Sequence, residues 1–168
     1  MAKEILRNRS NGELYFSEAE ALVPAGCLQI WLARVQSDYP VKGAHFVAAR
    51  DQLHQKVETG PHDPALLSAL GLIDAALGCP KEAINEAKRA VEMLPIYKDA
   101  WDGPLLVYNL AAVYGLTNQT NSAFEQLANL MNIQGGILYG ELKLDPAWDP
   151  LRKDSRFDKL LAELAPKD

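Results

Sequence analysis

Small residues recur at fixed intervals in the middle of this chain, and their spacing limits the folds available to it. Gly71 lies twelve residues before Ala83, Ala90 follows seven residues later, and Pro95 follows after five more. Positions that must stay small mark places where two helices approach closely, because a larger side chain would hold the helices apart. The spacing therefore indicates helix packing rather than chemistry.

The same intervals recur on either side of this stretch, which indicates an internal repeat of about 34 residues. Downstream, Ala111 and Ala123 are again twelve residues apart, and Leu130 follows seven residues later. Upstream, an alanine and a proline lie thirty-four residues before Ala83 and Pro95, namely Ala49 and Pro61. Repeats of this length are supersecondary units that bury their apolar faces by stacking on one another.

Turn-forming residues divide the chain into segments of roughly 12 to 18 residues, which is helix length. One segment has apolar residues every three or four positions from Leu66 to Leu77, and Asp63 before Pro64 is typical of a helix start. The sustained alternation of polar and apolar residues that indicates strands is lacking. We therefore predict an all-α fold of antiparallel helix pairs. The expected breaks are at 38–40, 59–64, 78–80, 95, 101–104, 117–121 and 134–136.

The composition is that of one globular domain, with 168 residues of which 48% are hydrophobic. A net charge of −5 disfavours a nucleic-acid surface, which needs clustered Lys and Arg. The most basic stretch is interleaved with Glu82 and Glu86, a pattern typical of a solvated helix face. Without a long apolar run or a signal-peptide core, we expect no membrane span and a cytoplasmic location. Cys27 and Cys79 are expected to be reduced thiols, and a disulfide stays open.

The residues that carry the spacing resemble the tetratricopeptide repeat (TPR), a helix-turn-helix unit of 34 residues. They are Leu70, Gly71, Gly78, Glu82, Ala83, Ile84, Ala90 and Pro95. The resemblance implies a short right-handed α-solenoid of about three repeats over 26–136, in which 64–97 is the best match. A C-terminal capping segment, 137–168, would follow these repeats, and residues 1–25 would precede them as a helix or a linker.

The two outer repeats match this pattern less completely. The unit 26–63 matches in its second helix only, and its first helix would lie near 28–37. The unit 104–136 matches after an insertion at 98–103.

Residues 142–161 resemble the segment that closes tetratricopeptide arrays in many bacterial regulatory and signalling proteins. The matching residues are Leu144, Asp145, Pro146, Trp148, Asp149, Pro150, Leu151, Arg152, Arg156 and Phe157. A solenoid needs such a cap, because its last repeat would otherwise leave an apolar face in water. We expect Ser155 to cap the last helix. The residues expected to cover the open end are Trp148, Leu151, Phe157, Leu160 and Leu161.

Signals for catalysis, a cofactor or a metal are weak. His45 and His54 are nine residues apart on one expected helix and His62 is in a turn, so these residues do not form a metal-ligand pair. Two acidic pairs lie among turn formers and are interpreted as helix caps: Asp99 with Asp102, and Asp145 with Asp149. We therefore expect that the chain is not an enzyme and has no catalytic, cofactor-binding or metal-binding residues.

In tetratricopeptide arrays the first helix of each pair lines a concave groove, so the resemblance places a partner site on two of the expected helices. The groove candidates are Ser68, Leu72, Ala75, Ala76, Leu105, Tyr108, Asn109, Ala112 and Leu116. Tyr108 would be the aromatic anchor, since interface hot spots favour Tyr. Only Asn109 resembles the polar set with which chaperone-binding members hold a peptide carboxylate, so that mode is not expected. Three tryptophans are expected to be packing residues: Trp31, Trp101 and Trp148.

The predicted function is a non-catalytic protein–protein interaction scaffold, which binds a protein or peptide and, by resemblance, belongs to the tail of a bacterial regulator. Two alternatives stay open: a regulatory domain that takes a small ligand in the groove, and a homodimerisation module. The state of the groove also stays open: it is accessible, it is filled by the N-terminal segment, or its residues are simply core.

Overall fold

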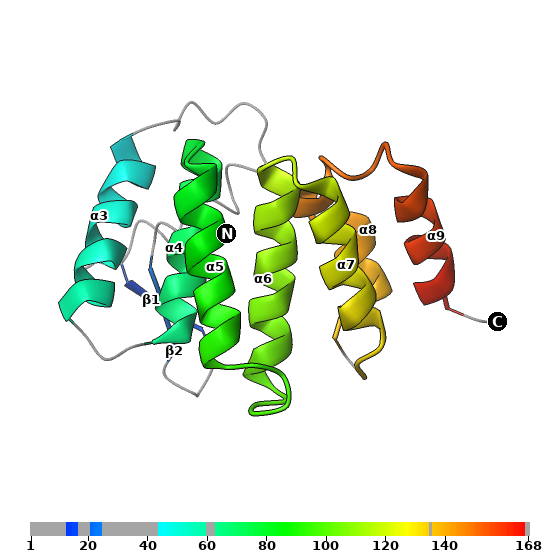
Figure 1. Ribbon diagram of the computed structural model, residues 1–168, viewed down its shortest axis with the longest axis horizontal. Helices are drawn as coiled ribbons and strands as arrows, with labels where there is room; N and C mark the ends of the chain where they lie inside the picture. The colour runs from blue at the N-terminus through cyan, green and yellow to red at the C-terminus, as the bar shows by residue number, and fades with distance from the viewer. Residues whose placement is uncertain (1–12, 17–20, 25–43, 60–62, 135, 167–168) are drawn as a thin grey trace.

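The computed structural model describes residues 13–16, 21–24, 44–59, 63–134 and 136–166, and most of these are helical (Figure 1). The prediction of a helical fold is therefore confirmed over this part of the chain. The helices are α3 (Ala44–Thr59), α4 (Pro64–Leu77), α5 (Pro80–Met93), α6 (Asp102–Leu116), α7 (Thr120–Met131), α8 (Tyr139–Leu144), the short 3-10 helix η1 (Pro146–Trp148) and α9 (Ser155–Leu164).

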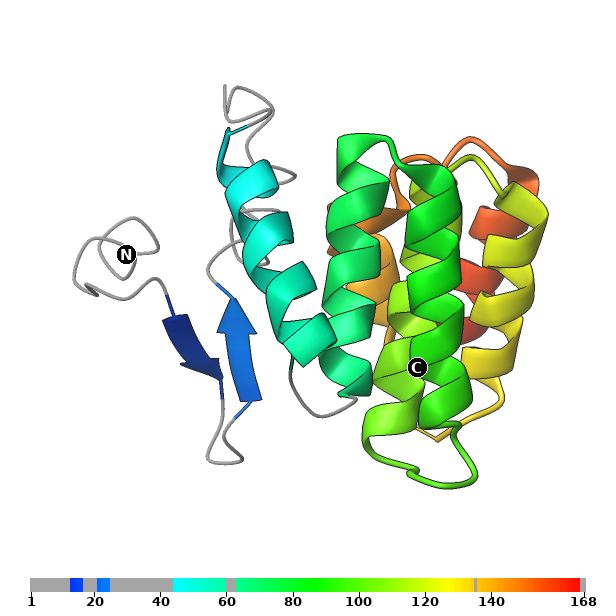
Figure 2. The same cartoon turned by 60° about the vertical axis from the view of Figure 1, so that its left-hand side comes forward.

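Two short strands near the N-terminus depart from the all-α prediction. The strands β1 (Glu13–Phe16) and β2 (Ala21–Pro24) pair antiparallel, with Glu13 opposite Pro24 and Phe16 opposite Ala21. Figure 2 places this hairpin at the α3 end of the helical part. A helix or a linker was expected over 1–25, and these two segments form neither. Strands of four residues are too short to show sustained alternation, so the sequence pattern did not reveal them.

Most predicted helix breaks agree with the structure. The side chain of Asp63 accepts a hydrogen bond from the Ala65 amide at 2.8 Å, as expected of the N-cap of α4. Gly78 has a φ of 79°, the left-handed conformation that ends α4 and leads directly into α5. The break at 101–104 is an exception, because α6 already begins at Asp102. Pro104 fits in its first turn, where its missing N–H leaves no hydrogen bond unmade. The break at 38–40 and the expected helix near 28–37 lie outside the described residues.

The regular spacing of small residues is explained by close packing of α4 on α5. A Cβ atom added to Gly71 would lie 2.9 Å from the carbonyl oxygen of Ala83 and 3.1 Å from the amide nitrogen of Ala87. Five further positions of the spacing are fully buried, namely Ala83, Ala90, Ala111, Ala123 and Leu130, and Pro95 is half-buried. The prediction that these are packing positions is therefore confirmed.

Successive helices pack side by side along the molecule, as both ribbon views show (Figures 1 and 2). Helix α4 contacts α3, α5 and α6, and α6 in turn contacts α5, α7 and η1. Short turns join α4 to α5 and α6 to α7, so each of these pairs is antiparallel. Among the helices that the structure describes, none combines the length and apolar character needed to cross a membrane.

The C-terminal segment covers the end of the helical array, as predicted. Trp148, Leu151 and Phe157 are buried in the same apolar cluster as residues of α6 and α7. Leu160 and Leu161 are half-buried and pack against that cluster. The cap of α9 was wrongly assigned to Ser155: the side chain of Asp154 accepts the hydrogen bond from the Arg156 amide, at 3.0 Å, and is the N-cap.

Candidate functional site

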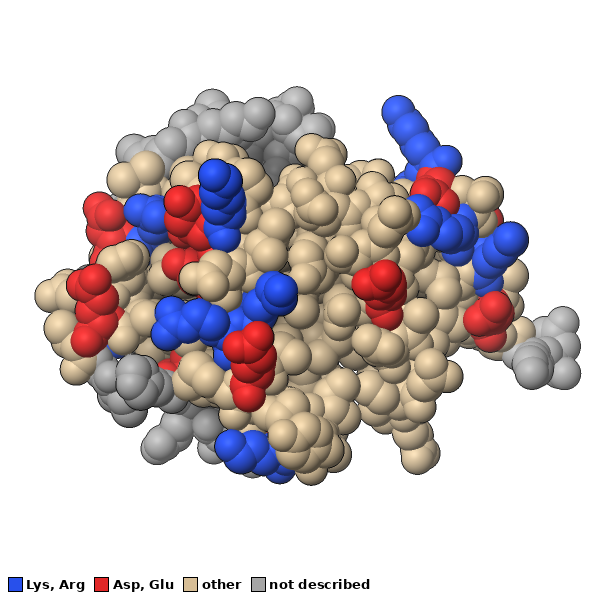
Figure 3. Space-filling model, in the orientation of Figure 1, with Lys and Arg blue, Asp and Glu red and all other residues tan. Residues whose placement is uncertain are grey.

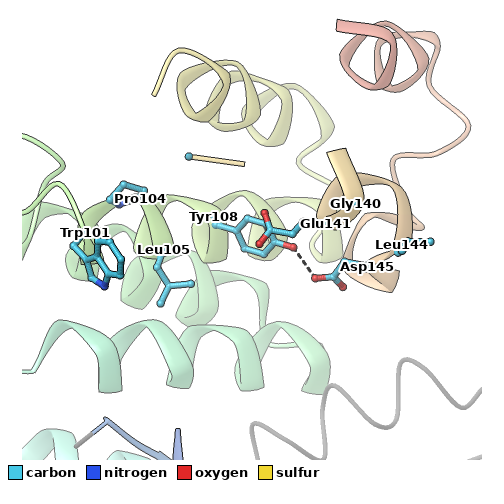
Figure 4. Close-up of a pocket in the computed structure, with 9 residues that line it drawn as sticks. Trp101, Pro104, Leu105, Tyr108, Gly140, Glu141, Leu144 and Asp145 are labelled. Carbon is cyan, nitrogen blue, oxygen red and sulfur yellow. Dashed lines mark hydrogen bonds between the residues drawn. The ribbon is translucent and has the colours of Figure 1, made fainter. Parts of the chain in front are cut away.

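A pocket of about 540 Å³ lies between α6 and α8. One wall follows α6, where Trp101, Leu105 and Tyr108 succeed one another at helical spacing (Figure 4). The opposite wall comes from α8 and the residues around it. The described residues that line it are Trp101, Pro104, Leu105, Tyr108, Gly136, Gly140, Glu141, Leu144 and Asp145.

The rim of the pocket carries large apolar side chains that face solvent. Trp101 is 89% exposed, Leu144 is 74% exposed and Leu105 is 58% exposed. Apolar groups gathered around one hollow are typical of a surface that binds a partner, whereas single exposed ones are common everywhere. Trp101 was expected to be a packing residue, which is wrong; Trp148 is buried as expected, and Trp31 lies outside the described residues.

Tyr108 joins the two walls of the pocket. Its hydroxyl donates a hydrogen bond to Oδ2 of Asp145 at 2.6 Å (Figure 4), and its ring meets the Trp148 ring edge-on, with centroids 5.0 Å apart. Burial, and then the hydrogen bond to the Asp145 carboxylate, raise the pKa of Tyr108 above its usual value. Tyr108 therefore lines the pocket, but its hydroxyl is already used to hold α6 against the end of α8.

The acidic groups on the α8 side also have structural partners. Oε2 of Glu141 accepts a hydrogen bond from the Leu138 amide at 2.9 Å and so caps α8. Oδ1 of Asp145 accepts from the Ala147 amide at 2.8 Å and caps η1, as predicted. Asp99 likewise caps the start of α6 by accepting hydrogen bonds from the amides of Trp101 and Asp102.

Most of the other predicted groove residues are used in packing between helices. Oγ of Ser68 accepts a hydrogen bond from Nδ2 of Asn109 at 2.9 Å, which links α4 to α6. Ser68, Ala75 and Ala112 are buried, and Leu72 and Leu116 are half-buried against apolar clusters. Ala76 is exposed but does not line the pocket. Of the nine candidates, Leu105 and Tyr108 are the two that line it.

Sequence reasoning missed the α8 wall. Glu141, Leu144 and Asp145 lie at the junction of the last expected repeat and the capping segment, and the cap alone seemed to explain them. The spacing of Glu141 and Asp145, four residues apart and beside Leu144, was the signal that could have drawn attention to this stretch.

A second group of polar side chains is buried between α3, α4 and α5, outside the pocket. Nε of Arg50 forms an ion pair with Oδ1 of Asp74, and Nη2 of Arg50 lies 3.2 Å from Oδ2 of Asp74, which is fully buried. Burial, and then the charge of Asp74, raise the pKa of Glu86 to about 8. Glu86 was expected on a solvated helix face; it is half-buried instead, because α5 turns this residue toward α4.

The remaining chemical candidates lie apart from the pocket. His45 and His54 both belong to α3, as predicted, and Nδ1 of His54 lies 3.4 Å from Oε1 of Glu58 on the exposed face. Cys79 is a free thiol, and Cys27 and His62 lie outside the described residues. Within the described ranges, no three His, Cys, Asp or Glu side chains gather as metal ligands would.

Comparison with known proteins gives no match. No protein-family model matches the chain, and neither does any curated sequence or solved structure. The tetratricopeptide resemblance therefore stays a prediction, and function is inferred from the pocket and its surroundings.

Proposed function

We propose that the chain is a non-catalytic protein-interaction scaffold that presents the pocket between α6 and α8 to a segment of another protein. The observation that carries the proposal is the ring of exposed apolar side chains around the pocket, formed by Trp101, Leu105 and Leu144. Buried hydrophobic and aromatic anchors supply most of the free energy of protein association. A rigid wall formed by α6 lowers the cost of binding, because little ordering is needed.

The proposed scaffold is a short right-handed α-solenoid of tetratricopeptide type. Two features support it: the close approach at Gly71, and the way α4 contacts both its partner α5 and the next helix pair through α6. The buried side chains of Trp148 and Phe157 support a C-terminal cap. The resemblance of 142–161 supports a place in the tail of a cytoplasmic bacterial regulator.

The polar groups of the pocket favour binding over catalysis. The carboxylates of Glu141 and Asp145 are helix caps, and the Tyr108 phenol is held protonated by its raised pKa. General acid–base chemistry needs groups whose pKa lies near the working pH. These groups instead fix the shape of the site.

Selection from a displayed library of random short peptides tests this proposal. Peptides enriched on the wild-type chain are expected to lose binding to L105D, because a carboxylate on the pocket wall would be desolvated by an apolar ligand. The matched control is V47D, since Val47 is also an exposed apolar residue but lies on α3. Peptides that bind L105D and wild type equally, or no enrichment, would contradict the proposal.

Solution mass measured across protein concentration separates the homodimer alternative. We expect a wild-type monomer over the range in which the selected peptides bind. A wild-type dimer that L105D converts to a monomer, and V47D does not, would assign the pocket to self-association. Thermal stabilisation by a metabolite, lost in L105D alone, would favour the small-ligand alternative.

A further inference from the structure

The pocket between α6 and α8 joins an apolar rim to an acidic end. We propose that the segment it takes carries a Lys or Arg beside a large apolar side chain, with the cation held near Glu141 and Asp145. This inference rests on the proposed function and adds the chemistry of the partner. The apolar side chain lies against Leu105 and Leu144, within reach of Trp101.

The first observation is the distribution of charge along the chain. Between Lys98 and Lys143 the sequence has no Lys, Arg or His, whereas it has Asp99, Asp102, Glu125 and Glu141. Both walls of the pocket come from this stretch or from the residues directly after it. Figure 3 shows the face of the molecule on which α7 lies in front of α8, and there charged side chains gather over α3 to α5 and over α9. Among the described residues that line the pocket, Glu141 and Asp145 are acidic and none is Lys, Arg or His.

The second observation is that Lys143 of α8 and Arg152, which follows η1, have other acceptors. Nζ of Lys143 lies 3.1 Å from the Tyr139 hydroxyl and 5.1 Å from the centre of the Tyr139 ring. Arg152 pairs with the Asp149 carboxylate at 2.7 Å and donates to the backbone carbonyl of Asp145 at 3.2 Å. Neither Lys143 nor Arg152 is therefore bound to the carboxylate of Glu141 or to that of Asp145.

The third observation is the acceptor capacity of these two carboxylates. An ionised carboxylate offers about four lone-pair sites. At Glu141, one lone-pair site accepts the hydrogen bond that caps α8. At Asp145, two sites accept hydrogen bonds, one from the Ala147 amide and one from the Tyr108 hydroxyl. Glu141 and Asp145 are four residues apart, so they lie one helical turn from each other at the same end of the pocket (Figure 4). Both side chains line the pocket, so an ammonium or guanidinium group bound there would lie near acidic groups.

Charge complementarity also excludes the opposite partner. An acidic segment or a free C-terminal carboxylate would bring like charges together at Glu141 and Asp145, which disfavours binding. The pocket is therefore the reverse, in charge, of a site that holds a peptide carboxylate with Lys and Arg.

The test uses the best peptide from the selection described above and two synthetic analogues of it. Lys or Arg is replaced by norleucine, which keeps the length and removes the charge, or by Glu. Binding to the full chain is measured by titration at low and at physiological salt. We expect norleucine to weaken binding about 5-fold and Glu to weaken it more, with both effects shrinking as salt rises.

The E141Q variant tests whether the preference for a cationic peptide arises from the pocket. The amide keeps an oxygen that can accept from the Leu138 amide, so the cap of α8 survives while the charge is lost. We expect E141Q to reduce the preference for the original peptide over the norleucine peptide, with Asp145 retaining part of it. E125Q is the matched control, because Glu125 is an exposed residue of α7, and we expect it to keep the preference for the cation.

Two results would overturn the inference in different ways. Peptides that need Leu105 but bind equally well with Lys, norleucine or Glu would refute the cationic partner and leave the proposed function standing. Failure to obtain any peptide that depends on Leu105 would refute both. Enrichment of acidic peptides on the wild-type chain would also contradict the cationic partner.

Discussion

The two halves of the helical array are stabilised by different kinds of contact. In the half formed by α3, α4 and α5, the ion pair between Arg50 and Asp74 is buried beside Glu86, and the apolar clusters around it are small. In the half formed by α6 to α9, one large apolar cluster includes Trp148 and Phe157. The first half therefore combines small apolar clusters with a buried ion pair, and the second relies on the burial of larger side chains.

This difference explains where a binding site can form. A surface keeps exposed apolar residues in place only if the helices behind it are firmly packed, because loosely packed walls would collapse onto them. Helix α6 lies on the large cluster and can therefore present Trp101 and Leu105 to solvent. In the half formed by α3, α4 and α5, the buried polar contacts join the three helices.

Truncation of Trp148 should have the largest effect on stability. W148A removes a fully buried indole and the edge-on contact with Tyr108, which should lower the free energy of unfolding by about 3–5 kcal/mol. Urea unfolding followed by circular dichroism measures this. W101A is the control, because Trp101 is almost fully exposed. Equal losses in the two variants would contradict the claim that burial of Trp148 stabilises the half formed by α6 to α9.

Breaking the buried ion pair should have the next largest effect. R50M leaves the Asp74 carboxylate buried without its partner, which should cost about 2–3 kcal/mol of stability, since Arg50 itself is partly exposed. The double variant R50M/D74N should recover much of the loss, because it removes the uncompensated charge. A double variant less stable than R50M would contradict the claim that the unpaired charge of Asp74 causes the loss of stability.

A pair of glycine substitutions compares the packing of α4 with that of α6. G71A should lose about 1–3 kcal/mol, since the new Cβ would clash with the backbone of Ala83 and Ala87. G115A should be neutral or gain up to about 1 kcal/mol, because the nearest atoms to its Cβ are 3.7 Å away or more and alanine favours helices. Equal changes in the unfolding midpoints of the two variants would contradict the tighter packing at Gly71 than at Gly115.

The smallest effect should come from E86Q and should depend on pH. The pKa of Glu86 is raised from 4.5 to about 8, so the folded chain keeps a proton that the unfolded chain releases. Wild-type stability should therefore fall as pH rises from about 4.5 to 8 and level off above that range. The charges that act on Glu86 are Asp74 and Glu82, which raise its pKa, and Arg50, which lowers it.

E86Q should remove this pH dependence. Near pH 4.5 it should be about as stable as the wild type, and near pH 8 it should be more stable by about 1 kcal/mol, because solvent screens a half-buried group. Denaturant unfolding across pH 4.5 to 9 measures the difference. Parallel curves for the two proteins would show that Glu86 is not the group that titrates.

The sequence predicted the packing of the helices better than it predicted the site. Gly71 and Ala83 could be interpreted correctly, because tight helix contacts leave a periodic trace of small residues along the chain. The pocket depends on a contact between Tyr108 and Asp145, which are 37 residues apart, and no local pattern records such a pairing. Glu86 was misjudged for a related reason, since its burial depends on Arg50 and Asp74 from two other helices.

The most direct test of the account is hydrogen exchange of the chain with and without a selected peptide. We predict slower exchange of amides at 101–108 of α6 and 138–145 around α8 when the peptide is bound, with little change in α3 and α5. Protection confined to α3, α4 or α5 would place the binding surface in the other half of the molecule and contradict the proposed site.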